Sequence, residues 1–122
     1  MQVEIIKTFR FEAAHSLDRA PAGHKCRQLH GHSYRVDVHV MGPVDAGAGW
    51  VMDFGQLVQA VEPVLRPLDH RNLNEVSGLE NPTSELLAKF LWDRLRPALP
   101  GLSAVTVWES DTSRCVYRGA GQ

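Results

Sequence analysis

Two long segments of the chain alternate between apolar and polar side chains with a period of two. In residues 3–15 the odd positions are apolar apart from Lys7, and His15 continues that row. In residues 30–40 the even positions hold two histidines, a tyrosine and three valines, and the odd positions are mostly polar. Alternate residues of a strand face opposite sides. The pattern therefore predicts two long strands, each with one buried face, and Gly42-Pro43 is expected to end the second.

A helix is predicted to follow the second strand. Asp53 is a candidate N-cap, and Gln56 lies three residues later, which is the spacing of a capping box. Apolar residues then recur at helical spacing up to Leu65. Pro63 lies inside this pattern and is expected to kink or shorten the helix. Just before the helix, Trp50-Val51-Met52 is expected to form a short strand.

Shorter patterns complete the predicted fold. A second helix is expected to start near Asn81-Pro82-Thr83 and to stop at Pro97 or Pro100. Apolar residues alternate in residues 105–109, which predicts a third long strand, and residues 115–117 form a short last one. The order of two strands, two helices and two strands indicates an α+β fold.

Composition and charge narrow the class of protein. A chain of 122 residues fits one domain, residues 1–122, and 43% hydrophobic with 22% charged residues is ordinary globular usage. The net charge of −1 gives no basic field for nucleic acid or a membrane, and no apolar run reaches the roughly 20 residues that span a bilayer. Two cysteines are too few for a disulfide framework, and the N-terminus lacks a secretory signal. We expect a cytoplasmic protein that binds neither nucleic acid nor membranes.

Three of the six histidines form a candidate metal site. His30 and His32 lie on one face of a predicted strand, about 6.5 to 7 Å apart along the chain, so both rings can reach one ion. His15 ends the other long strand with matching parity, and an antiparallel hairpin would bring it to the same end of the sheet. Three imidazoles with an open fourth position are typical of catalytic zinc. The alternative is three unconnected histidines, two of them merely buried.

Cys26 lies four residues before His30 and directly after Lys25. It can be a fourth zinc ligand that closes a structural site, or a nearby nucleophile or base. Cationic neighbours favour the thiolate form, so Lys25 and a nearby zinc ion both support a reactive thiol. Cys115 lies in a short apolar strand, which is more typical of a small buried apolar side chain.

Two acidic positions complete the candidate chemistry. Asp69 precedes His70 after the first helix, and a carboxylate beside an imidazole can orient it and raise its basicity. A solvated surface pair is the alternative. Glu109 would lie on the inner face of its strand, where a carboxylate needs a partner. That partner is either an apposed Arg or Lys or a planar ligand with two parallel N–H donors.

Six short motifs lie along nearly the whole chain: Phe11-Glu12-Ala13-Ala14-His15, Cys26-x-x-x-His30-Gly31-His32-Ser33-Tyr34, Asp53-Phe54, Leu68-Asp69-His70-x-x-Leu73-Asn74, Asn81-Pro82-Thr83-Ser84-Glu85 and Trp108-Glu109. In this set and order they resemble the 6-pyruvoyltetrahydropterin synthase and 6-carboxytetrahydropterin synthase family. The resemblance implies the tunnelling fold, in which a ββααββ subunit has an antiparallel sheet with two helices on one face. Such subunits assemble into β-barrel oligomers, commonly hexamers, with active sites at subunit interfaces.

The interval between the cysteine and the His-x-His pair separates branches of this family. The short interval from Cys26 to His30, preceded by Gly23-His24-Lys25, resembles that of the bacterial 6-carboxytetrahydropterin synthases of the queuosine pathway. The pyruvoyl-forming branch usually has a longer interval. The resemblance implies a zinc-dependent carbon–carbon lyase that converts 7,8-dihydroneopterin triphosphate to 6-carboxytetrahydropterin, acetaldehyde and triphosphate.

The resemblance also implies a role for each candidate residue. The three histidines hold zinc, whose open position takes the side-chain hydroxyls of the substrate. Cys26 is the proton acceptor, Asp69 and His70 form a proton relay, and Glu109 anchors the amino group and ring N–H of the pterin. The triphosphate needs cations, for which the sequence offers three candidates: Lys25, Arg27 and Arg71.

Three hypotheses for function therefore stand at this stage. The first is the carbon–carbon lyase. The second is the related phosphate-eliminating enzyme, which forms the pyruvoyl product and stops before cleavage of the side chain. The third is a non-catalytic zinc module in which Cys26 is the fourth ligand and the oligomer is a scaffold.

Overall fold

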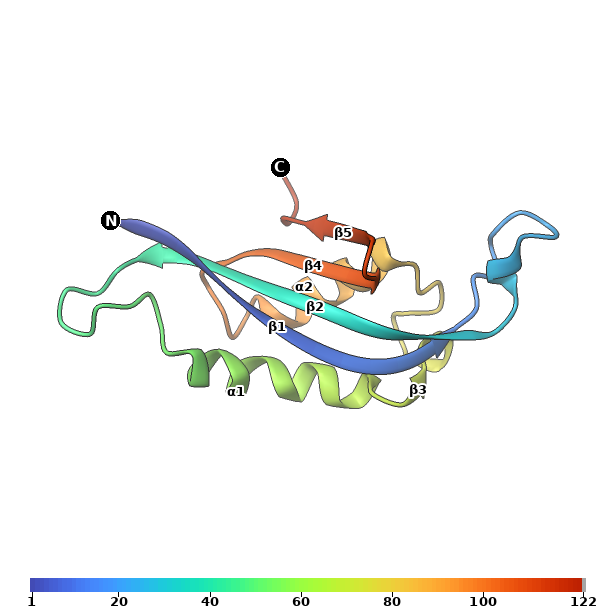
Figure 1. The fold of residues 1–122 in the computed structure, drawn as a ribbon, viewed down its shortest axis with the longest axis horizontal. Helices are drawn as coiled ribbons and strands as arrows, with labels where there is room; N and C mark the ends of the chain where they lie inside the picture. The colour runs from blue at the N-terminus through green and yellow to red at the C-terminus, as the bar shows by residue number, and fades with distance from the viewer. Residues whose placement is uncertain (122) are drawn as a thin grey trace.

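A five-stranded sheet with two helices on one face makes up the structure, a computed structural model that describes residues 1–121 (Figure 1). The strands lie in the order β3-β1-β2-β4-β5. No helix in this range is long and apolar enough to cross a membrane. The elements in chain order are β1 (Gln2–His15), η1 (Lys25–Arg27), β2 (His30–Pro43), α1 (Phe54–Leu65), η2 (Arg66–Leu68), β3 (Arg71–Asn72), η3 (Leu73–Glu75), α2 (Ser84–Leu95), β4 (Leu102–Ser110) and β5 (Ser113–Tyr117).

The two predicted long strands form one antiparallel hairpin of 14 residues each. Gln2 pairs with Pro43 at one end and His15 with His30 at the other, without a break in register. The alternation seen in the sequence is confirmed, because the odd positions of β1 and the even positions of β2 are the less exposed ones. The second strand ends at Pro43, as expected.

The core lies between this inner face of the sheet and the two helices. Leu57, Val61 and Leu65 of α1 and Leu87 and Leu91 of α2 are buried in the same cluster as the inner-facing side chains of the strands. The outer face of the sheet is covered by no helix (Figure 1). Its side chains are largely polar, as the odd positions of β2 predict.

Both helices begin at the predicted capping residues, but Pro63 disturbs α1 less than predicted. Asp53 caps α1, and its carboxylate accepts from the Gly55 backbone while Gln56 completes the capping box. Thr83 caps α2 through Leu86 N–H. Pro63 does not break α1, which continues for two residues and then tightens into η2. A proline that close to the C-terminus disturbs only the last turn of the helix.

Two parts of the predicted strand pattern differ from the structure. Residues 50–52 form bends instead of a strand, because the loop closes on itself through a hydrogen bond from Asp45 N–H to Trp50 O. The sheet also contains β3, which pairs in parallel with residues 13–14 of β1. The sheet is therefore mixed instead of purely antiparallel, although every long pair in it is antiparallel.

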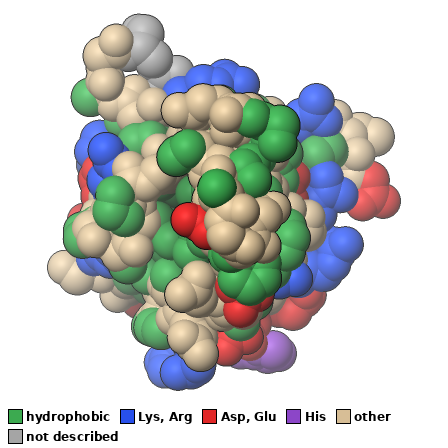
Figure 2. Space-filling view, turned by 90° about the vertical axis from the view of Figure 1, so that its left-hand side faces the viewer, with side chains coloured by type: hydrophobic (Ala, Val, Ile, Leu, Met, Phe, Trp, Pro, Cys, Tyr) green, Lys and Arg blue, Asp and Glu red, His purple; other side chains and the backbone are tan. Residues whose placement is uncertain are grey.

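Apolar side chains are exposed at the end of the molecule where β1 begins. Figure 2 shows hydrophobic groups gathered in the middle of this end, with charged groups around them. Met1, Trp50 and Phe54, which belong to the first residue and the β2–α1 connection, are 87%, 51% and 49% exposed. Exposed apolar groups that lie together often mark an interface with another protein chain.

The packing of α2 gives a prediction for stability. Leu91 is fully buried in the core, whereas Leu86 on the same helix is 44% exposed. Leu91→Ala should lower the free energy of unfolding by about 2–5 kcal/mol, because it leaves a cavity. Leu86→Ala is the matched control and should change it by less than about 1 kcal/mol. Denaturant unfolding at one fixed protein concentration measures both, and equal losses would contradict this description of the core.

Candidate metal centre and catalytic site

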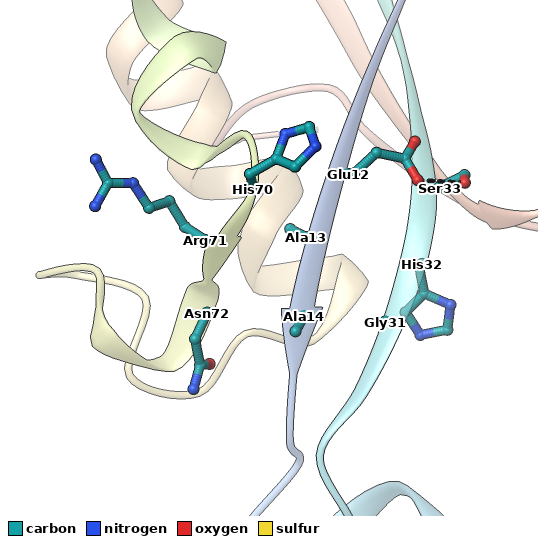
Figure 3. A pocket seen from close by; sticks show the side chains of 9 residues that line it. All are labelled: Glu12, Ala13, Ala14, Gly31, His32, Ser33, His70, Arg71 and Asn72. Atoms are coloured by element: carbon teal, nitrogen blue, oxygen red, sulfur yellow. Dashed lines mark hydrogen bonds between the residues drawn. The ribbon is translucent and has the colours of Figure 1, made fainter.

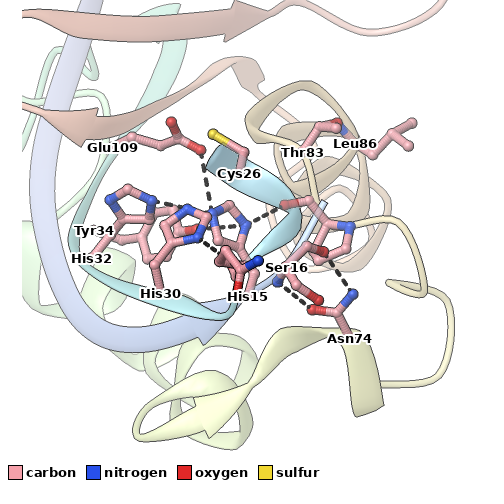
Figure 4. A network of polar contacts seen from close by, with 12 residues as sticks. His15, Ser16, Cys26, His30, His32, Tyr34, Asn74, Thr83, Leu86 and Glu109 are labelled. Atoms are coloured by element: carbon pink, nitrogen blue, oxygen red, sulfur yellow. Dashed lines mark hydrogen bonds and ion pairs between the residues drawn. The ribbon is translucent and has the colours of Figure 1, made fainter. Parts of the chain in front are cut away.

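Three imidazole rings converge at one end of the β1–β2 hairpin, on the inner face of the sheet (Figure 4). The register pairs His15 with His30 and Ala13 with His32. The last residue of β1 therefore lies beside the first residues of β2, and their side chains come together. One ring nitrogen of each histidine lies within 4.8 Å of the others. The predicted convergence of His15, His30 and His32 is confirmed, and the reading of three unconnected histidines is wrong.

Backbone carbonyls fix the orientation of two of these rings. His15 Nδ1 lies 2.8 Å from the carbonyl oxygen of Pro82, and His30 Nδ1 lies 2.7 Å from that of Gln28. A carbonyl oxygen only accepts, so both Nδ1 atoms donate to these carbonyls and the Nε2 atoms are left on the other side of each ring. Metal-bound histidines are commonly held by such a hydrogen bond on the other ring nitrogen.

The donor set fits a tetrahedral ion such as zinc. The Nε2 atoms of His15 and His32 are 3.1 Å apart. Two nitrogens at roughly 2.0–2.1 Å from a tetrahedral ion are separated by about 3.3 Å, so the rings need almost no movement to share one. Three imidazoles leave a fourth position for water or substrate.

The surroundings of His32 favour its neutral form, which is the form that binds metal. Burial lowers the pKa of His32, the charges of His15 and His30 lower it further, and Glu109 opposes this change. Burial also raises the pKa of the Tyr34 phenol, so this group stays protonated. Its hydroxyl lies 3.2 Å from His15 Nδ1. Burial therefore favours the neutral forms of His32 and Tyr34.

Glu109 lies at the edge of the cluster. The β4–β5 ladder shifts register between Trp108 and Ser110, and a shift of this kind redirects the side chain between them. Glu109 Oε1 is 3.9 Å from His15 Nε2, and the side chain is 30% exposed. Among residues 1–121, His15 is the one ion-pair partner of this carboxylate. The sequence left an apposed Arg or Lys as one possible partner of Glu109. No such ion pair occurs among residues 1–121.

Cys26 lies on the single turn of η1, where its thiol is half-buried. In Figure 4 the thiol points to the side of Glu109 and the histidine rings. The group of side chains close enough to share an ion contains the three histidines and not Cys26. The arrangement favours a thiol beside the metal centre over a fourth ligand.

Asp69 and His70 lie at the edge of β1 that faces away from β2. Asp69 Oδ1 accepts from Glu12 N–H at 2.9 Å and lies 3.0 Å from His70 Nδ1. The hydrogen bond from Glu12, together with His70, lowers the pKa of Asp69. His70 has a positive φ of 60°, and its side chain is 77% exposed. The two residues form a pair, as the sequence predicts.

Within one chain this pair does not meet the metal centre. The chain carries His70 directly into β3, and two strand spacings of about 4.8 Å separate β3 from β2. Figure 3 shows His70 and His32 on opposite sides of β1, around a cavity of about 480 Å³ on the outer surface. Sequence reasoning gives no face for residues on an irregular connection, so it could not reveal this separation.

The three candidate cations differ in whether their side chains already have hydrogen-bond or ion-pair partners. Arg27 Nη1 donates to the carbonyls of Asp18 and Ala20, each at 2.8 Å, and so holds the loop between β1 and β2. Lys25 and Arg71 are exposed and make no ion pair among the residues described. The structure thus leaves these two as candidates to contact a phosphate.

One site contact was missed from the sequence. Asn74 holds the peptide that follows His15, because its amide accepts from Ser16 N–H and donates to Ser16 O, both at 2.8 Å. Its place in the Leu68–Asn74 motif was the signal that could have identified it. Pro82 also lies in one of the six motifs, whereas Gln28 occupies an unspecified position of the Cys26–Tyr34 motif, so the sequence offered no signal for its carbonyl.

Comparisons with known proteins agree with this geometry. Residues 4–120 match the family model described as 6-pyruvoyl tetrahydropterin synthase. A protein of Synechocystis named 6-carboxy-5,6,7,8-tetrahydropterin synthase is 43% identical over 119 residues, which cover 93% of this chain and 91% of that protein. A dihydroneopterin monophosphate aldolase of Pyrococcus furiosus is 37% identical, with 91% and 93% covered.

Human and nematode proteins extend the similarity. The human 6-pyruvoyl tetrahydrobiopterin synthase is 33% identical, with 97% of this chain and 92% of that protein covered. The structure of a Caenorhabditis elegans 6-pyruvoyl tetrahydropterin synthase superposes with a TM-score of 0.91 at 29% identity, over 98% of this chain and 97% of that chain. The expected α+β fold is confirmed by this match and by the sheet itself. The chain therefore belongs to the 6-pyruvoyl tetrahydropterin synthase family.

Proposed function

We propose that this protein is a zinc-dependent 6-carboxytetrahydropterin synthase, a carbon–carbon lyase of queuosine biosynthesis. Its substrate is 7,8-dihydroneopterin triphosphate, and its products are 6-carboxytetrahydropterin, acetaldehyde and triphosphate. The observation that carries the proposal is a three-histidine centre with a thiol and a carboxylate beside it, outside the ligand set. The similarity to the Synechocystis protein supports this branch of the family.

Each group of residues has its own role in the proposed reaction. His15, His30 and His32 hold the zinc ion, which supplies a Lewis acid for oxygens of the substrate side chain. Cys26 takes a proton from that side chain, as a base within reach of the centre. Glu109 accepts two parallel N–H groups from the pterin edge and borders a cavity of about 190 Å³.

The proton relay of Asp69 and His70 comes from a second copy of the chain in this proposal. Within one chain the pair lies on the β3 side of β1, away from the three histidines. Only an assembly can therefore place it against a metal centre. A homohexamer with active sites at subunit interfaces is the assembly we propose. The edge of β1 pairs with β3 at only two positions, and the exposed apolar end of the molecule offers further contact area. We place the protein in the cytoplasm, where its two free cysteines remain thiols.

The reaction itself is the direct test. Zinc-loaded protein is incubated with 7,8-dihydroneopterin triphosphate, and the pterin is identified by mass spectrometry while acetaldehyde is assayed separately. A carboxypterin with matching acetaldehyde supports the lyase. A pyruvoyl product without acetaldehyde would assign the phosphate-eliminating reaction instead, and no turnover by intact, metal-bound protein would favour a binding module.

Cys26→Ala separates an enzyme from a structural zinc module. We expect the variant to keep its zinc and to lose turnover by about 10²-fold or more, the scale for removal of a general base. Gln59→Ala is the control, since this side chain is exposed on α1 and is no part of the centre or of the cavity beside Glu109. Metal analysis with steady-state kinetics measures both effects. Loss of zinc from Cys26→Ala would make the thiol a ligand and overturn its assignment as the base.

Glu109→Ala tests the pterin anchor. The carboxylate touches His15 only at 3.9 Å and lies outside the group that can share an ion, so zinc content should not change. Binding of the pterin should weaken by about 10-fold or more, because a charged hydrogen-bond acceptor is lost. Titration with a pterin product measures affinity without turnover. Zinc loss in this variant would contradict the anchor role.

Zinc binding should depend on pH. An imidazole must be neutral to bind metal, and free histidine titrates near pH 6.5, so occupancy should fall below roughly pH 6. The pKa of His32 is lower in the folded protein than in the unfolded chain. As the pH falls, His32 is therefore protonated in the unfolded chain before it is protonated in the folded protein. The free energy of unfolding of the metal-free protein should therefore decrease as the pH drops below about 6.5. Metal analysis after dialysis and denaturant unfolding measure the two effects, and full occupancy at about pH 4 would contradict a three-histidine site.

A further inference from the structure

The loop between β1 and β2 fixes the backbone around Cys26 with its own hydrogen bonds. Leu17 N–H donates to Cys26 O at 2.7 Å, which joins the two ends of the loop. The guanidinium of Arg27 donates to two further carbonyls of the same loop. The carbonyl group of Cys26 is therefore hydrogen-bonded to the segment that follows His15.

The amide side of Cys26 is held by a side chain that the proposed reaction does not use. His24 Nδ1 accepts from Cys26 N–H at 3.0 Å, and His24 is the N-cap of η1. The first N–H groups of a helical turn have no partner inside the turn, so a capping side chain is what orders them. The backbone of His24 is itself fixed, because His24 N–H donates to Pro21 O and Arg27 N–H donates to His24 O.

We propose that His24 is a positioning residue for Cys26. Its imidazole holds the amide of Cys26 while Leu17 holds the carbonyl, so the peptide groups on both sides of the thiol are fixed. With the backbone fixed, the thiol keeps its direction towards Glu109 and the histidine rings (Figure 4). This inference rests on the proposed function, because it is the role of Cys26 as proton acceptor that gives the contact a consequence.

The effect of His24 passes through Cys26 alone. The His24 side chain is exposed, belongs to no core cluster and is absent from the group that can share an ion. The hydrogen bond to Cys26 N–H is the one side-chain hydrogen bond of His24 among residues 1–121. A change at His24 should therefore alter neither the core nor the metal centre.

His24→Ala and His24→Asn form a matched pair for the test. Asparagine places Oδ1 the same number of bonds from the backbone as Nδ1 of histidine, and it is a favourable N-cap. In the zinc-loaded, full-length enzyme, His24→Ala should speed exchange of the Cys26 amide and lower kcat, each by a factor of about 3 to 10, with KM within about twofold. His24→Asn should restore both values, and zinc content should be the same in all three proteins.

Arg19→Ala is the control within the same loop. Its side chain is exposed and makes no hydrogen bond or ion pair among the residues described, so exchange and kcat should match those of the unaltered protein. Unchanged protection of the Cys26 amide in His24→Ala would overturn the inference, and so would equal loss of kcat in His24→Ala and His24→Asn. If the unaltered enzyme does not turn over the pterin triphosphate, the proposed function fails. Amide exchange then still decides whether His24 holds Cys26.

Discussion

The register of the β1–β2 hairpin is the constraint on which the rest of the structure depends. Alternate side chains face opposite sides of a strand, so a slip of one residue would turn every inner side chain outwards. The same register that buries Phe11 against Tyr34 also pairs His15 with His30. Fourteen pairs without a break carry this alignment from the core to the three histidines, so folding the core correctly also brings their rings together.

The site combines buried side chains with partly exposed ones. Burial keeps His32 and Tyr34 in their neutral forms on the inner face. Glu109 is partly exposed at the rim and lies 3.9 Å from His15 Nε2. Asp69 and His70 form a second, more exposed pair at the edge of β1 that faces away from β2. The two groups of side chains therefore differ in their exposure to solvent.

Much of this arrangement could be predicted from the sequence because it follows from short-range rules. Period-two alternation gave both long strands, and Asp53 with Gln56 gave the start of α1. The parity of His15 and the spacing of the His-x-His pair were sufficient to place three ligands together.

What the sequence could not show depends on contacts between distant parts of the chain. β3 is two residues long, which is too short for any periodicity, and it exists because Ala13 and Ala14 offer it an edge. The apolar run at residues 50–52 has the composition of a strand, but the chain closes into a loop there through the hydrogen bond from Asp45 N–H to Trp50 O. The side of β1 on which Asp69 and His70 lie is set by the bonds from Glu12 to their connection. None of these contacts has a local signature.

The carbonyls that orient His15 and His30 have a consequence for how this protein tolerates change. Both acceptors belong to the main chain, at Pro82 and Gln28, and no replacement of a side chain can delete a main-chain oxygen. Substitutions at these two positions can therefore accumulate without directly removing a ligand support, provided that the backbone keeps its path. The orientation of these two rings is therefore robust to substitution at the two supporting positions and sensitive to insertions or deletions that move the chain.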